Sequence, residues 1–134
     1  MTPTCVLDAS ALLALLQGEE GAAEVRQALR SRAAMSAVNL AEVLAKISDR
    51  GQDPAAVARL LDDRALFLEG IEVVPFDGDA ARETARLRKA TSGAGLSLGD
   101  RACLALAGVR DATALTSDRK WIHLRIGVRV RLIR

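Results

Sequence analysis

Aromatic residues are scarce in this chain: its 134 residues include two Phe, one Trp and no Tyr. Because half of the residues are nevertheless apolar, the hydrophobic core must be built mainly from aliphatic side chains. Such a composition favours closely packed helices over a β-sandwich. The two cysteines, Cys5 and Cys103, stand alone in apolar runs. They predict neither a disulfide framework nor a zinc knuckle, and we expect two reduced, buried thiols.

Long apolar runs and polar linkers are also missing. No stretch approaches the ~20 apolar residues of a membrane-spanning helix, and the first residues lack the basic segment and apolar run of a signal peptide. We therefore expect a cytoplasmic protein with no membrane partner. Because neither a linker nor an internal repeat divides the chain, residues 1–134 are predicted to form a single domain.

Acidic residues are absent after Asp118, whereas six basic residues occupy the last sixteen positions. The net charge of +2 is too small to indicate nucleic-acid binding by itself. A basic end of this kind can face phosphates, or it can protect an edge strand from pairing with other sheets. The sequence leaves both interpretations open.

Strands and helices alternate along the chain, which predicts an α/β fold with a mostly parallel sheet flanked by helices. The first strand is apolar throughout and is typical of a central strand covered on both faces. The expected strands are 5–8, 33–35, 71–76, 113–116 and 128–132. The expected helices are 9–16, 22–30, 37–48, 54–69 and 77–91, one that begins at Ser97, and a short turn at 121–124.

Acidic residues follow two of these strands or lie near the starts of helices. Asp8 ends the first strand and Asp118 follows the fourth, while Asp100 lies in the first turn of its helix. Glu42 lies further into its helix, six residues after the expected cap Ser36, and can reach the same edge. The carboxyl ends of parallel strands are where ligands bind, so we expect all four carboxylates to meet there.

Four ionised carboxylates need a cation, because two like charges ~4 Å apart repel by about 4 kcal/mol at an effective dielectric constant of 20. Oxygen ligands suit Mg²⁺ or Mn²⁺. Zinc is disfavoured because the single histidine, His123, has no nearby Cys or His. Neighbouring polar side chains are placed to orient the carboxylates or a bound water: Ser10, Asn39, Thr116 and Ser117.

Each of these charged residues also has a purely structural explanation. The explanations are caps for Asp8 and Asp118, a capping box with Ser97 for Asp100, and an ion pair with Lys46 for Glu42. The four together are harder to explain in this way, because Asp8 ends an apolar strand where a carboxylate is costly unless solvated or liganded. Arg101 and Arg119 each follow one of these aspartates and are candidates for phosphate contacts, if a nucleic acid binds, or for local ion pairs.

Four segments resemble, in order, the four motifs of PIN-domain ribonucleases. They are VLDASA (6–11), SAVNLAE (36–42), LSLGDRACLA (96–105) and LTSDRKW (115–121). The chain most resembles the VapC toxins of toxin–antitoxin pairs, over essentially its whole length. The Ser-Leu-Gly-Asp and Thr-Ser-Asp segments are the most specific parts of the resemblance.

The resemblance implies a PIN-like three-layer sandwich with a five-stranded sheet. It also implies an Mg²⁺- or Mn²⁺-dependent endoribonuclease that cuts a specific structured RNA by two-metal-type hydrolysis. Asp8 and Asp100 match the most constant metal-ligand positions, and Glu42 and Asp118 complete the catalytic and metal-binding cluster. The expected partners are the RNA substrate, a cognate antitoxin and a second copy of the chain in a homodimer.

Two other functions are compatible with parts of the sequence. An Mg²⁺-dependent phosphatase would use Asp8 as nucleophile, but a haloacid-dehalogenase-like site resembles Asp-x-Asp, whereas Ser10 stands at the third position. A non-catalytic binding module of PIN fold, held by its antitoxin, would keep the acidic pocket without using it.

Overall fold

A single five-stranded sheet forms the centre of the computed structural model, which describes residues 4–63 and 70–134. The strand order is β3-β2-β1-β4-β5, and every neighbouring pair is parallel. The predicted α/β fold is confirmed, with a fully parallel sheet where a mostly parallel one was expected. The strands are β1 (Cys5–Leu7), β2 (Ala33–Ser36), β3 (Ile71–Val74), β4 (Thr113–Thr116) and β5 (Val130–Leu132).

The helices fall where the sequence pattern places them. They are α1 (Ala9–Gln17), α2 (Ala22–Leu29), α3 (Ala37–Asp49), α4 (Pro54–Asp63), α6 (Gly78–Ala90), α7 (Leu98–Arg110) and the 3₁₀ helix η1 (Arg119–His123). The predicted end of the fourth helix near Glu69 lies outside the described residues. Three strands are shorter than predicted: β1 ends at Leu7, one residue before Asp8, and β3 and β5 are shortened as well. β3 stops before Pro75, which has no N–H to donate to a ladder, and β5 begins only at Val130.

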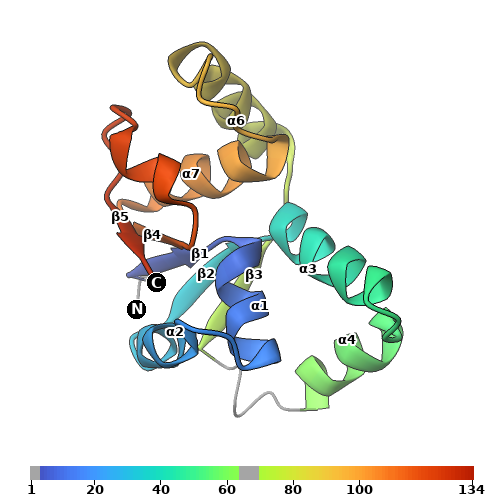
Figure 1. Cartoon of the computed structure of the whole chain (residues 1–134). Helices are drawn as coiled ribbons and strands as arrows, with labels where there is room; N and C mark the ends of the chain where they lie inside the picture. Colours follow the sequence, from blue (N-terminus) through green and yellow to red (C-terminus); the bar gives the residue numbers. More distant parts are fainter. Residues whose placement is uncertain (1–3, 64–69) are drawn as a thin grey trace.

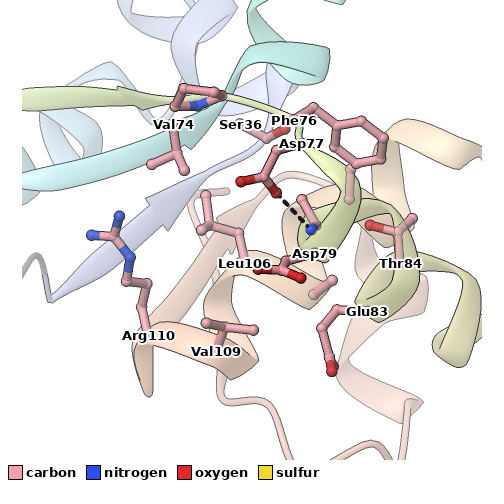
Figure 2. Close-up of a pocket in the computed structure, with 14 residues that line it drawn as sticks. Ser36, Val74, Phe76, Asp77, Asp79, Glu83, Thr84, Leu106, Val109 and Arg110 are labelled. Carbon is pink, nitrogen blue, oxygen red and sulfur yellow. Dashed lines mark hydrogen bonds between the residues drawn. The ribbon is translucent and has the colours of Figure 1, made fainter.

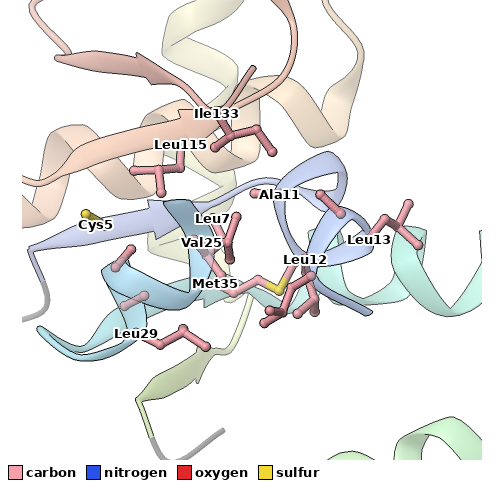
Figure 3. Packing of buried hydrophobic residues seen from close by; sticks show 14 of the residues in the cluster. Cys5, Leu7, Ala11, Leu12, Leu13, Val25, Leu29, Met35, Leu115 and Ile133 are labelled. Atoms are coloured by element: carbon pink, nitrogen blue, oxygen red, sulfur yellow. The ribbon is translucent and has the colours of Figure 1, made fainter. Parts of the chain in front are cut away.

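Helices cover both faces of the sheet, so the predicted three-layer sandwich is confirmed (Figure 1). Successive strand residues point to opposite faces. Leu7, Met35 and Leu115 pack with α1 and α2 on one face (Figure 3), while Val6 and Ala34 pack with α7 on the other. Helix α6 lies on α7, away from the sheet (Figure 1).

The core is aliphatic, as the composition predicts. Its large side chains include Leu7 and Leu104, each 0% exposed, and burying a leucine of this kind contributes about 2 kcal/mol. Trp121 is buried in the cluster around α7. Cys5 and Cys103 are both free and buried, as expected for isolated thiols. None of the described helices is long and apolar enough to cross a bilayer.

Three of the six basic residues in the C-terminal segment, those in or beside strand β5, are paired with acidic residues of the same chain. The ion pairs join Arg129 to Asp111 at 3.2 Å, Arg131 to Glu24 at 3.4 Å and Arg134 to Glu19 at 3.5 Å. Strand β5 lies at one edge of the sheet. The structure therefore supports the interpretation of a charged edge strand over that of a phosphate-binding surface.

Candidate active site

All four predicted carboxylates line one pocket of about 250 Å³. They come from the ends of β1 and β4 and from helices α3 and α7, which are far apart in the sequence. Three of the four predicted polar neighbours line it as well; the fourth, Thr116, is fully buried and hydrogen-bonded to Asp8. The lining residues are Asp8, Ala9, Ser10, Leu13, Asn39, Glu42, Lys46, Asp100, Ser117 and Asp118.

Asp8 is the most buried of the four carboxylates, at 6% exposed. It caps α1: its Oδ1 accepts hydrogen bonds from the Ala11 N–H at 2.8 Å and from Ser10 Oγ at 2.7 Å. Its Oδ2 accepts one from Thr116 Oγ1 at 2.5 Å. Burial raises the pKa of Asp8, and the charge of Asp100 adds to this effect, while the hydrogen bonds lower the pKa.

The ends of β1 and β4 are joined by hydrogen bonds beneath the pocket. Thr116 Oγ1 donates to Asp8 and accepts from the Asp118 N–H at 3.0 Å. The Ser117 N–H donates to Ser10 Oγ at 3.0 Å. The orientation of Asp8 therefore depends on the loop that carries Asp118.

The other carboxylates also accept local hydrogen bonds. Asp100 forms the predicted capping box with Ser97, and Asp118 caps η1 through the Lys120 N–H. Glu42 accepts from Asn39 Nδ2 at 3.0 Å; within the described part of the chain it forms no ion pair. The predicted capping roles of three carboxylates are confirmed, and each of these residues also lines the pocket.

The pKa of the buried Cys103 thiol is affected by the nearby carboxylates. Burial is the main cause that raises its pKa well above the ordinary value, and the charges of Asp8, Asp100 and Glu42 raise the pKa further. These three carboxylates therefore all lie close enough to Cys103 to disfavour its thiolate form. Several negative charges around one small pocket repel each other, so a positive charge is needed nearby to offset the repulsion.

A hard divalent cation fits this donor set. The pocket offers carboxylate oxygens and no histidine or cysteine, which suits Mg²⁺ or Mn²⁺ rather than zinc. Across residues 4–63 and 70–134, no three acidic, histidine or cysteine side chains converge closely enough to hold a metal ion directly. The carboxylates are instead turned toward the N–H, hydroxyl and amide donors described above.

The predicted RNA-contacting arginines lie outside this pocket. The Arg101 guanidinium donates to the Leu96 carbonyl at 2.8 Å and lines a separate pocket, and Arg119 is exposed at the start of η1. The positively charged side chain that lines the acidic pocket is that of Lys46. The sequence suggested Lys46 only as an ion-pair partner of Glu42. Its spacing of four residues from Glu42 places both on one face of α3.

A larger pocket, of about 430 Å³, lies between α6, α7 and the segment after β3 (Figure 2). None of the four predicted catalytic carboxylates lines it. Its own acids are engaged locally: Asp77 caps α6, Asp79 pairs with Arg82, and Glu83 pairs with Arg86. The carboxylate chemistry therefore belongs to the smaller pocket.

The buried charge of Asp8 has a predicted cost in stability. Because its pKa is raised on folding, the native state binds the proton more tightly than the unfolded state, and stability falls as pH rises through the raised pKa. In EDTA at pH 7, we expect Asp8→Asn to raise the unfolding midpoint by about 4 °C, or about 1 kcal/mol. Calorimetry from pH 4 to pH 8 measures the effect, which should shrink toward acidic pH.

Asp111→Asn is the matched control, because the Asp111 side chain is 92% exposed and Asp111 is the C-cap of α7, at the opposite end of that helix from Asp100. This variant should unfold at the wild-type temperature at every pH. An Asp8→Asn protein that is less stable than the wild type at pH 7 would show that the carboxylate stabilises the fold.

Known proteins resemble this chain over nearly its whole length. The PIN-domain family model matches residues 5–127. Ribonuclease VapC42 of Mycobacterium tuberculosis is 35% identical over 130 residues, which cover 90% of this chain and 95% of the relative. The structure of DNA-bound VapBC from Salmonella typhimurium aligns with a TM-score of 0.74 at 20% identity, covering 98% of each chain.

A further solved structure has the same fold. VapC20 of Mycobacterium tuberculosis, described as a toxin that cleaves the sarcin–ricin loop, aligns with a TM-score of 0.69 at 17% identity, covering 93% of this chain and 98% of its own. At these identities the structural matches concern the fold alone. The match to the PIN-domain family model and the 35% identity to Ribonuclease VapC42 are similarities of the amino-acid sequence. This chain is a member of the PIN-domain family, among ribonucleases of the VapC type.

Proposed function

We propose that this chain is the toxin of a toxin–antitoxin pair, a single-domain endoribonuclease that hydrolyses phosphodiester bonds of a specific structured RNA in the cytoplasm. One observation carries the proposal: four carboxylates from four separate segments line a single pocket. VapC-type ribonucleases depend on a metal ion in general. Mg²⁺ or Mn²⁺ is the proposed ion here, because the pocket offers carboxylate oxygens without histidine or thiolate ligands.

The chain itself would hold and orient the reacting groups. Asp8 and Asp100 are the proposed principal ligands, with Glu42 and Asp118 completing the set. Ser10 and Thr116 donate to Asp8, and these hydrogen bonds would fix the orientation of its carboxylate. When bound, a divalent cation favours attack by water on the phosphorus and offsets charge on the leaving oxygen.

Basic side chains around the pocket are proposed to bind the RNA backbone. Lys46 lines the pocket itself, and Arg119 is exposed next to Asp118. Arg101 would have to release the Leu96 carbonyl to reach a phosphate. These residues would position the RNA without reading its sequence, as phosphate contacts do.

A cognate antitoxin and a second copy of the chain are the proposed protein partners. One solved structure with this fold is a toxin–antitoxin complex from Klebsiella pneumoniae, and another is a member of the VapBC family of toxin–antitoxin systems from Mycobacterium tuberculosis. An acidic pocket attracts a basic segment, so we propose that the antitoxin covers the pocket and blocks access of RNA. The toxin is proposed to form a homodimer.

Mapping of RNA ends tests the proposed function. Antitoxin-free protein is incubated with total RNA in Mg²⁺, in Mn²⁺ and in EDTA, and new 5′ ends are identified by sequencing. We expect discrete cuts with either cation and none in EDTA. Cuts that persist in EDTA would contradict the metal-dependent mechanism, and release of inorganic phosphate from small phosphoesters without RNA cleavage would favour a phosphatase.

A further inference from the structure

Gly99, the second residue of α7, meets the carboxylate of Glu42 from α3. A Cβ atom added to Gly99 would lie 2.5 Å from both Cδ and Oε2 of Glu42, and closer still to Oε1. Real Cβ atoms do not come this close to other heavy atoms. The Glu42 carboxylate therefore occupies the space that a side chain at position 99 would fill.

The backbone conformation does not explain this glycine. Gly99 is not one of the glycines with positive φ, and it lies in the first turn of a regular helix. Glycine is less favourable than alanine in a helix. The absence of a side chain at Gly99 is therefore best explained by its close contact with Glu42.

Asn39 holds the same carboxylate from a second direction. Its Nδ2 donates to Glu42 Oε1 and to the Gly99 carbonyl, both at 3.0 Å. Both partners are acceptors, so only this orientation of the amide satisfies them. Asn39 is 1% exposed, and its buried Oδ1 has no hydrogen-bond partner among the residues that the structure describes. Asn39 thus fastens Glu42 to the first turn of α7.

We propose that Gly99 is a positioning residue for Glu42: its missing side chain lets the Glu42 carboxylate lie against the first turn of α7 and so join the acidic pocket. Gly99 acts only through Glu42, since it offers no side-chain ligand of its own. The inference rests on the proposed function in one respect, that the pocket binds a divalent cation.

Manganese binding tests this inference without measuring catalysis. The full chain is titrated with Mn²⁺ alone, and free Mn²⁺ is followed by electron paramagnetic resonance. We expect Gly99→Ala to weaken Mn²⁺ binding by about 10-fold, the scale on which residues that orient metal ligands act. Unfolding midpoints are measured for every variant to verify that it is folded.

Gly108→Ala is the matched control in the same helix. Within the described ranges, a Cβ at Gly108 would meet only Val128 Cγ2, at an ordinary contact distance of 3.5 Å. The two substitutions make the same change to the chain, but only the one at Gly99 meets a carboxylate. Gly108→Ala should bind Mn²⁺ like the wild type.

A double-mutant cycle separates positioning of Glu42 from general damage. If Gly99 acts through Glu42, then Gly99→Ala has no further effect on Mn²⁺ affinity in a Glu42→Ala background. A Gly99→Ala protein that unfolds while the double variant folds normally would report the same clash through stability. The inference is overturned if Gly99→Ala binds Mn²⁺ like the wild type, if it weakens binding equally in both backgrounds, or if the wild type binds no Mn²⁺.

Failure of the proposed function gives a different result. If the wild-type protein binds Mn²⁺ and Gly99→Ala weakens this binding, but the wild type cuts no RNA, the positioning role of Gly99 is supported and the proposed ribonuclease activity is contradicted. If the wild type cuts RNA and Gly99→Ala binds Mn²⁺ as tightly as the wild type, the proposed activity is supported and the positioning role of Gly99 is contradicted.

Discussion

Asp100→Asn is expected to lower the rate of RNA cleavage by about 1000-fold, equivalent to about 4 kcal/mol of transition-state stabilisation. The amide keeps an oxygen that can accept from the Ser97 N–H, as the carboxylate does, so the start of α7 should be preserved. Only the negative charge that would bind the cation is removed. The initial rate of cleavage of the mapped RNA target, at saturating Mg²⁺, measures the loss.

Asp111→Asn removes a carboxylate from the opposite end of the same helix. Asp111 is the C-cap of α7 with φ of 50°, a conformation that asparagine tolerates. Its side chain is exposed and pairs with Arg129, so this variant should keep the full cleavage rate. An Asp100→Asn protein that retains more than about a tenth of wild-type activity would exclude Asp100 as a principal metal ligand.

Thr116→Val is expected to lower the cleavage rate by about 100-fold, at the upper end of the effects of residues that orient metal ligands. Thr116 is fully buried, and its hydroxyl is the group shared by Asp8 Oδ2 and the Asp118 N–H. Valine leaves both groups without this partner, so two proposed ligands lose their orientation together. The cleavage rate as a function of Mg²⁺ concentration should show a higher requirement for Mg²⁺.

Thr116→Ser keeps the hydroxyl and is the control for this prediction. It should retain nearly the wild-type rate, although the lost methyl group costs some packing energy. The free energy of unfolding of the valine variant should also be lower by about 1 to 3 kcal/mol, because buried polar groups lose a hydrogen-bond partner. If serine impairs cleavage as much as valine, the methyl group matters more than the hydroxyl, and the orienting role is wrong.

Local features of the sequence predicted much of the fold and of the site. Asp8, Ser36 and Ser97 precede helices and cap them in the structure, because a cap depends only on residues within a turn of the helix start. The apolar run of the first strand predicted a buried central position, and β1 lies in the middle of the sheet. Parallel strand topology then placed Asp8 and Asp118 at the same edge.

Contacts between distant segments could not be predicted in this way. The sequence left the basic C-terminal end open to two interpretations, and the pairing of Arg131 with Glu24 and of Arg134 with Glu19 favoured the edge strand. Arg101 was a candidate for a phosphate contact or for a local ion pair because it follows Asp100. The turn of the helix instead directs its guanidinium to the Leu96 carbonyl.

The sequence by itself determined the order of the elements and the helix caps, because these follow from apolar periodicity and from hydrogen bonds within a few residues. It also identified the four acidic residues that line the pocket. Only the tertiary structure decided how the acidic side chains are held. Asn39 donates to the Gly99 carbonyl across 60 positions of the chain, and the Glu42 carboxylate fills the space beside Gly99. Such contacts depend on how closely two helices approach, which packing of the whole core determines.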